Sequence, residues 1–230
     1  IENLKYENVT LFVEKDTLQT IFIKPAKKAK ATILYFHGNS GNYSENIELV
    51  KPLVEDGFQV FMAEYRGYGK SSGKPTHLNI ASDAQVIFDY LINRRDVENT
   101  KIIIYGSSIG CQVATNLTMK NQTKIKALIL DSGFASFTDI ALASRPIEQH
   151  STIKYYVTSP YAAKDDISKI ENVNKLIIQS PKDEVAPFEK GKLLFDNAKE
   201  PKTFYEYQGN HIKAMKIDSV KLLVEINKLL

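Results

Sequence analysis

Residues 101–110, Lys-Ile-Ile-Ile-Tyr-Gly-Ser-Ser-Ile-Gly, decide the fold of this 230-residue chain. The run at 102–105 contains only β-favouring side chains, which is typical of a short buried parallel strand. Residues 111–120 then continue with helix-compatible side chains. The frame is therefore strand, Gly-x-Ser-x-Gly, helix, and this order predicts a nucleophile elbow. The alternative is an ordinary helix start with a serine cap.

An elbow of this kind explains each residue of the pentapeptide. A side chain at Gly106 or Gly110 would collide with the neighbouring strand or helix, because the turn is so tight. The turn would lift the Ser108 hydroxyl into the open and point the N–H of Ile109 at the same spot. Ser108 lies midway between the glycines, so it is the candidate nucleophile rather than Ser107.

The composition limits the class of protein. Hydrophobic residues make up 43% and charged residues 25%, which is ordinary for a soluble globular protein. The formal net charge of +3 gives no indication of a nucleic-acid partner. One cysteine excludes an internal disulfide framework and a cysteine-based zinc site. No run is long enough to span a membrane, so no anchor is visible and a cytoplasmic location is favoured, although the chain begins with Ile1 and a signal or anchor could have been removed.

Strands and helices alternate along the chain. We expect an antiparallel hairpin at 9–13 and 17–23 with its turn at Lys15-Asp16. Further strands are predicted at 31–36, 58–64, 102–105, 125–130, 176–179 and 203–207, and helices at 46–56, 80–93, 111–120, 186–198 and 212–230. This pattern predicts one α/β domain over residues 1–230, with a mostly parallel sheet covered by helices on both faces. Functional loops then lie beyond the carboxyl ends of the strands.

A serine nucleophile needs a base, and a third group that orients the base. Of the four histidines, His211 is the best base, because it follows the last strand and its Gln-Gly-Asn-His loop can fold back over the sheet edge. The alternative is an exposed histidine near a helix start. His77 lies at a helix entry and His150 in an irregular segment, so we expect neither at the site. His37 is predicted to brace the loop after its strand.

The acid should lie between Ser108 and His211 and follow a strand. Asp183 is preferred, since its loop lies next to that of His211 in the expected strand order. Asp131 also ends a strand and is the rival.

Acyl transfer also needs N–H donors where negative charge develops. Ile109 supplies one donor. The second is expected from the loop 37–42, where Asn39 is the first choice and Ser40 the next.

Two nucleotide-binding patterns fail. Gly69-Lys70-Ser71 resembles the end of a phosphate-binding loop, but Glu64 stands where the first glycine is required. Gly67-Tyr68-Gly69 lacks its third glycine, because Ser72 occupies that position. The sequence therefore predicts no nucleotide cofactor, and we expect no other cofactor and no metal.

Together these motifs resemble the α/β-hydrolase superfamily over nearly the whole chain. The chain is similar to small, short-lid serine hydrolases of the esterase and thioesterase type, which share His-Gly-Asn-x-Gly-Asn, Tyr-Arg-Gly-Tyr-Gly-x-Ser-x-Gly and Gly-x-Ser-x-Gly, here at 37–42, 65–73 and 106–110. The resemblance implies a triad of Ser108, Asp183 and His211 that cleaves esters or thioesters of a small or lipid-like acyl substrate. A peptidase or carbon–carbon hydrolase would use the same triad, and a non-catalytic binding protein is a further alternative.

Two segments depart from that group or leave a choice open. The acid strand ends in Gln-Ser-Pro-Lys-Asp at 179–183, where the group usually has His-Gly-x-x-Asp, while Gly-Asn-His at 209–211 keeps the Gly-x-His form. A short cap is expected at about 134–166. Its aromatic residues either line an acyl pocket or pack the cap onto the domain. The oligomeric state is left open.

Overall fold

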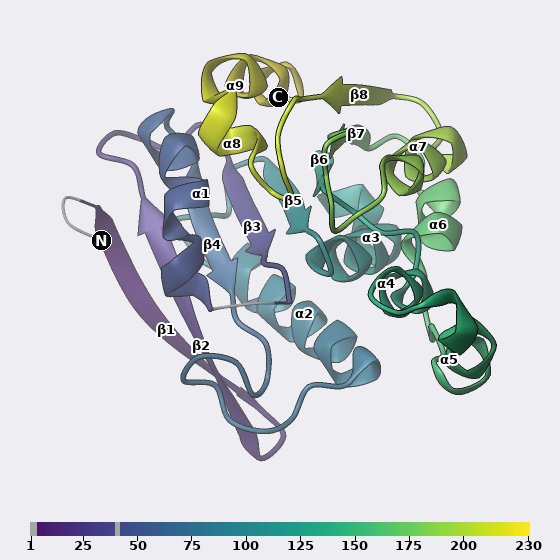
Figure 1. Cartoon of the computed structure of the whole chain (residues 1–230). Coiled ribbons are helices and arrows are strands. Elements are labelled where there is room, and N and C mark those ends of the chain that lie inside the picture. Colours follow the sequence, from purple (N-terminus) through teal and green to yellow (C-terminus); the bar gives the residue numbers. More distant parts are fainter. Residues whose placement is uncertain (1–3, 40–41) are drawn as a thin grey trace.

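The computed structural model describes residues 4–39 and 42–230 (Figure 1). Ser40 and Gly41 of the expected oxyanion loop lie outside the described residues.

Within those residues, eight strands form one sheet in the order β1-β2-β4-β3-β5-β6-β7-β8. The strands are β1 (Lys5–Val13), β2 (Asp16–Lys24), β3 (Thr32–Phe36), β4 (Gln59–Ala63), β5 (Ile102–Ser107), β6 (Ala127–Asp131), β7 (Asn174–Gln179) and β8 (Lys202–Glu206). The β1–β2 and β2–β4 pairs are antiparallel, and every other pair is parallel. The predicted fold, a mostly parallel sheet with an N-terminal antiparallel hairpin, is confirmed.

Helices cover both faces of the sheet (Figure 1). The α-helices are α1 (Tyr43–Glu55), α2 (His77–Ile92), α3 (Gly110–Asn121), α4 (Phe137–Ala143), α5 (His150–Tyr156), α6 (Ala163–Asp166), α7 (Phe188–Asn197), α8 (Ala214–Ile217) and α9 (Ser219–Lys228). Short 3-10 helices are η1 (Gln122–Lys124), η2 (Ile147–Gln149) and η3 (Ile167–Lys169).

Strand β3 shows how the core is divided. Ile33 and Tyr35 pack with α1 and α9, whereas Leu34 and Phe36 pack with α2 and α3. Successive side chains of a strand point to opposite faces, so a strand covered on both sides must be apolar at every position. Each such side chain contributes roughly 1.5–3 kcal/mol when fully buried. This is why the central strands read as uninterrupted apolar runs.

The predicted single helix at 212–230 is wrong. The segment forms two helices, α8 and α9, with Asp218 between them at φ −134° and ψ 36°. The Asp218 carboxylate accepts a hydrogen bond from the hydroxyl of Tyr205 on β8. This tertiary contact accompanies a non-helical residue inside an otherwise continuous helical pattern.

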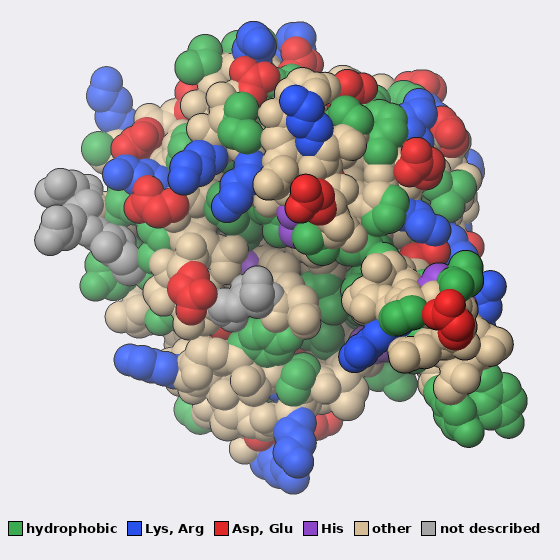
Figure 2. Space-filling view, in the orientation of Figure 1, with side chains coloured by type: hydrophobic (Ala, Val, Ile, Leu, Met, Phe, Trp, Pro, Cys, Tyr) green, Lys and Arg blue, Asp and Glu red, His purple; other side chains and the backbone are tan. Residues whose placement is uncertain are grey.

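The segment expected to form the cap, at about 134–166, contains α4, η2, α5 and α6, and its aromatic residues divide into two groups. Phe134, Phe137 and Tyr161 are buried. The ring of Phe137 stacks on that of His77 at 3.7 Å and meets Tyr161 edge-on. Tyr155 and Tyr156 on α5 are 80% and 75% exposed. Figure 2 shows a hydrophobic projection in the lower right, where Figure 1 places α5. The buried group therefore holds the cap onto the sheet domain.

A substitution at Gly110 tests the packing of the elbow. A Cβ at this position would collide with the carbonyl oxygen of Phe36 in the adjacent strand. Backbone atoms cannot give way cheaply, so we expect Gly110→Ala to lower the free energy of unfolding by about 3 kcal/mol or more. Urea unfolding measures the change. Gly38→Ala is the control, because its nearest neighbour lies at an ordinary 3.4 Å. Equal midpoints for the two variants would contradict the expectation.

Candidate active site

The elbow places Ser108 between the end of β5 and the start of α3. Its backbone has φ 53°, a left-handed conformation that is uncommon for a residue other than glycine. The N–H of Ser108 donates to the carbonyl oxygen of Asp131 at 2.9 Å, which ties the turn to the neighbouring strand β6. Strained backbone of this kind persists where the surrounding structure enforces it, and it is concentrated at functional sites.

Ser108 is less open than the elbow alone suggests. Only 7% of the residue is exposed. A Cβ built on Gly38 would lie 3.4 Å from Cβ of Ser108 and 3.5 Å from Cδ1 of Ile212. The loop after β3 and the loop after β8 therefore flank the same point beside the serine.

His211 and Asp183 meet although they are 28 positions apart in the chain. The His211 ring Nδ1 lies 2.8 Å from Oδ2 and 3.0 Å from Oδ1 of Asp183. An ionised carboxylate can only accept, so Nδ1 carries the proton and the lone pair of Nε2 is left for a further donor. The Asp183 side chain is fully buried, and 17% of the His211 side chain is exposed.

Hydrogen bonds keep Asp183 ionised. Burial alone would raise the pKa of this carboxyl, but the hydrogen bond from His211 and those from Ala186 and Val185 outweigh it, so its pKa lies below the ordinary value. The N–H groups of Val185 and Ala186 donate to Oδ1 at 2.9 and 2.8 Å. The local turn before α7 therefore orients the carboxylate.

Asp131, the rival acid, has different partners. It accepts from the hydroxyls of Tyr105 and Ser132 at 3.1 and 3.2 Å. Burial raises its pKa to about 6, against the lowering effect of these two hydrogen bonds. Within the described residues, His211 is hydrogen-bonded to Asp183 and not to Asp131.

In the described part of the chain, the Ser108 hydroxyl forms no hydrogen bond with His211. In enzymes without substrate, catalytic hydrogen bonds are often long and tighten only in the complex. Ser108 and Ile212, the neighbour of His211, both lie beside Gly38, so the two loops meet at this point.

Near Ser108, the backbone N–H groups of Ile109 and Asn39 have no acceptor among residues 4–39 and 42–230. Ile109 precedes the first turn of α3, where helix N–H groups have no partner within the helix. The Asn39 side chain accepts from the hydroxyl of Tyr68 at 2.9 Å, which holds the start of the oxyanion loop. Both N–H groups are thus free to donate among the described residues, and their role as oxyanion donors stays a prediction.

His37 is fully buried beneath that loop. Its Nδ1 donates to the carbonyl of Gly38 at 2.7 Å, and its Nε2 lies 2.7 Å from Oε1 of Glu64. The other carboxylate oxygen of Glu64 accepts from the N–H of Tyr43 at the start of α1 at 3.0 Å. This arrangement fits the predicted bracing role of His37.

Comparison with known proteins identifies the family. The sequence profile of the alpha/beta hydrolase fold family matches residues 31–156, more than half of the chain. The chain belongs to the alpha/beta hydrolase family. It is 35% identical over 197 residues to Protein bem46 of Schizosaccharomyces pombe, covering 84% of this chain and 66% of that protein. It is 32% identical over 191 residues to Lysophosphatidylserine lipase ABHD12 of Gallus gallus, covering 76% and 49%.

Solved structures agree on the fold. The esterase Pf2001 of Pyrococcus furiosus superposes with a TM-score of 0.77 at 18% sequence identity, covering 99% of this chain and 92% of that one. The chain spans 66% of the length of Protein bem46 and 49% of the length of the Gallus gallus lipase.

One residue of this hydrolase site was not predicted from the sequence. Ser180 is fully buried, and its hydroxyl accepts from the N–H of Lys182 at 3.0 Å and from the N–H of Gly209 at 3.2 Å. It therefore joins the loop that carries Asp183 to the loop that carries His211. The Gln-Ser-Pro-Lys-Asp segment at 179–183 was the signal, since its serine offers a hydroxyl at a position where the group that the sequence resembles usually has glycine.

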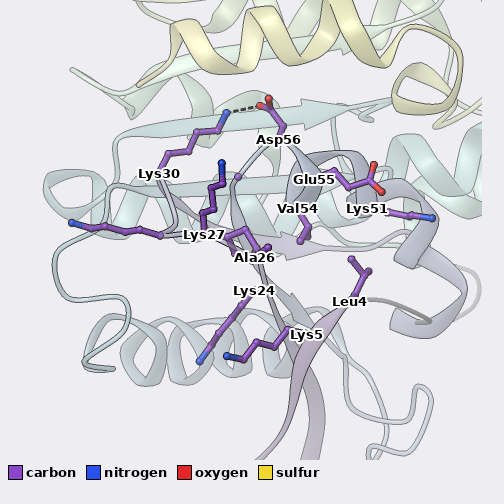
Figure 3. A pocket seen from close by; sticks show the side chains of 13 residues that line it. Leu4, Lys5, Lys24, Ala26, Lys27, Lys30, Lys51, Val54, Glu55 and Asp56 are labelled. Carbon is purple, nitrogen blue, oxygen red and sulfur yellow. Dashed lines mark hydrogen bonds and ion pairs between the residues drawn. The ribbon is translucent and has the colours of Figure 1, made fainter.

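One hollow of the hydrolase lies away from this site. It has a volume of about 660 Å³ and contains none of the residues discussed above. Figure 3 shows that several lysines line it together with apolar side chains such as Leu4 and Val54. Two of the lysines are paired with carboxylates, Lys30 with Asp56 and Lys24 with Asp96. The hollow thus shares no residue with the candidate site.

No helix in the described ranges is long and apolar enough to cross a bilayer. Across residues 4–39 and 42–230, no three His, Cys, Asp or Glu side chains are grouped so that they could hold a metal ion.

Proposed function

We propose that this hydrolase cleaves carboxylic esters or thioesters through an acyl-enzyme intermediate. Ser108 is the nucleophile, His211 the general base and Asp183 the acid that orients the base. The observation that carries the proposal is the bond between His211 and Asp183 at the sheet edge where Ser108 is held at φ 53°. A buried carboxylate on Nδ1 is what a serine–histidine pair needs to leave Nε2 as an acceptor.

The proposed reaction has two halves. The Ser108 Oγ bonds to the acyl carbon while its proton passes to His211 Nε2, and the N–H groups of Ile109 and Asn39 receive the negative charge on the carbonyl oxygen. Collapse of this tetrahedral intermediate breaks the C–O or C–S bond of the substrate, and the leaving alcohol or thiol takes the proton from His211. Water then attacks the acyl-enzyme by the same route and releases the acid. Asp183 stays ionised and stabilises the imidazolium in both halves.

The substrate is proposed to be a small or lipid-like acyl compound. The relative from Gallus gallus carries the name of a lysophosphatidylserine lipase, and a lipase cleaves an ester between an acyl chain and an alcohol. That name supports the ester class for this chain. The acyl preference is proposed separately, from the cap.

Acyl chain length tests the cap. Phe134, Phe137 and Tyr161 are buried in packing the cap onto the domain, so a short cap of this kind offers limited apolar surface to a long chain. We expect turnover of p-nitrophenyl esters to fall beyond about eight carbons, because methylenes that extend past the pocket stay in water and add no binding energy. If palmitoyl esters or thioesters are turned over faster than butyryl ones, the proposal of a short pocket is wrong and a long acyl groove is indicated.

The acyl-enzyme itself is the test of the reaction class. Rapid quenching after mixing with a p-nitrophenyl ester should trap an acyl group on the peptide that contains Ser108, detected by mass spectrometry, together with a burst of p-nitrophenol. An active enzyme with no trapped acyl group and no burst would argue for direct hydrolysis by water.

A further inference from the structure

The residue after the proposed base is strained. Ile212 has φ 55°, in the left-handed region that β-branched residues almost never adopt. Such a conformation persists only where surrounding contacts impose it. Because Ile212 directly follows His211, the direction of the imidazole depends on whatever holds this backbone.

A hydroxyl from a distant strand end holds it. The N–H of Ile212 donates to Oγ of Ser132 at 3.1 Å, across 80 positions of sequence. Ser132 is fully buried and is itself at φ 54°. Its own N–H donates to the carbonyl of Ile178 on β7 at 2.9 Å, so the hydroxyl is anchored to the sheet.

The Ser132 hydroxyl has a defined orientation. It has one proton, which it donates to Oδ1 of Asp131 at 3.2 Å, and this leaves its lone pairs directed at the N–H of Ile212. Asp131, the rival acid, therefore has a place in the site without touching His211.

A second contact brackets the same loop. The Tyr207 hydroxyl donates to the carbonyl of Asn210 at 2.7 Å and accepts from the N–H of Lys213 at 3.2 Å. It also lies 3.4 Å from Oγ of Ser132. Tyr207 thus binds the loop at Asn210 and at Lys213. The hydrogen bond from the N–H of Ile212 to Ser132 lies between these two points, next to His211.

We propose that Ser132 is a positioning residue for the base: its hydroxyl keeps Ile212 in the left-handed conformation and thereby aims His211 at Ser108. This inference rests on the proposed serine-hydrolase function. Ser132 touches neither the substrate nor Ser108 in this mechanism, and it acts only through the backbone of the His211 loop.

The proposal predicts a specific kinetic change in Ser132→Ala. Without the acceptor, Ile212 relaxes toward negative φ and His211 is aimed correctly for only part of the time. We expect kcat to fall about tenfold or more while KM stays within about twofold, because substrate binding does not involve this loop backbone. Kinetics are measured well below the thermal transition of each variant, which separates the effect from a loss of folded protein.

Relief of the strain provides the decisive control. Glycine adopts positive φ without steric cost, and asparagine tolerates it better than isoleucine. In an Ile212→Gly or Ile212→Asn background, Ser132→Ala should therefore cost less than about threefold in kcat, a clear departure from additivity. An equal loss in all backgrounds, or unchanged kcat in Ser132→Ala alone, would overturn the proposal.

Amide exchange separates this inference from the proposed function. NMR-detected exchange of the Ile212 N–H should be slow in the wild-type protein and faster in Ser132→Ala, whatever the substrate. If the Ile212 N–H exchanges faster in Ser132→Ala but the wild-type protein hydrolyses no ester, the hydrogen bond is supported and the ester chemistry is rejected. An active wild-type enzyme with the same Ile212 exchange in Ser132→Ala would reject the positioning role alone.

Discussion

Replacement of Ser108 by alanine will abolish ester turnover, with an expected loss in kcat of about six orders of magnitude, as when the nucleophile of another triad is removed. The physical reason is that the φ of 53° and the hydrogen bond from its N–H to the carbonyl of Asp131 fix the Ser108 side chain at the turn before α3, next to Ile109. A fluorophosphonate should label the wild-type protein and leave Ser108→Ala unlabelled, as seen by intact-mass measurement.

Ser107→Ala is the matched control. Ser107 is the adjacent serine and is also buried, and its hydroxyl accepts from that of Tyr35 at 3.1 Å. Its loss leaves the Tyr35 hydroxyl without this acceptor and costs about 1–3 kcal/mol of stability, but labelling should persist. If labelling survives in Ser108→Ala and disappears in Ser107→Ala, the nucleophile is Ser107 and not Ser108.

Replacement of Asp183 by asparagine is expected to cut turnover by about four orders of magnitude, as in other triads that lose the orienting carboxylate. An amide at this position can donate to Nδ1 of His211, which stabilises the tautomer with the proton on Nε2, where the Ser108 proton must go. The imidazolium also loses its counter-charge. The measurements are kcat on a short p-nitrophenyl ester and an unfolding curve to confirm that the variant is folded.

Asp131→Asn is the comparison for that variant. Its carboxyl, with a pKa raised to about 6, faces Tyr105 and Ser132 rather than His211. An asparagine oxygen can still accept one of these bonds, so we expect a loss in kcat of about tenfold or less. Inactivity of Asp131→Asn combined with an active Asp183→Asn would assign the acid to the earlier strand.

The elbow and the sheet were predictable because their causes are local. Residues 102–105 are apolar at every position since both faces of β5 are covered, and Gly106 and Gly110 are glycines since a Cβ at either would meet backbone atoms. Steric demands of this kind act between neighbours in the chain or on adjacent strands. They therefore leave a pattern that can be read from sequence, and the order strand, elbow, helix follows from it.

Tertiary structure alone decided which side chains His211, the proposed base, contacts. Asp183 and Asp131 both follow a strand, and only the course of two loops brings His211 to the first. The hydroxyls of Ser180 and Ser132 accept from N–H groups 29 and 80 positions away. Nothing in the residues next to these serines encodes such partners.

The same limit explains the error at the C-terminus and the division of the cap. The helical pattern at 212–230 is continuous in sequence, but Asp218 lies outside the helical region and is bonded to Tyr205 on another element. Phe137 and Tyr155 have similar side chains, and only the path of α4 and α5 buries one and exposes the other. Periodicity reports which side chains can be buried together, whereas a hydrogen bond between distant residues depends on loop geometry that exists only in the folded chain.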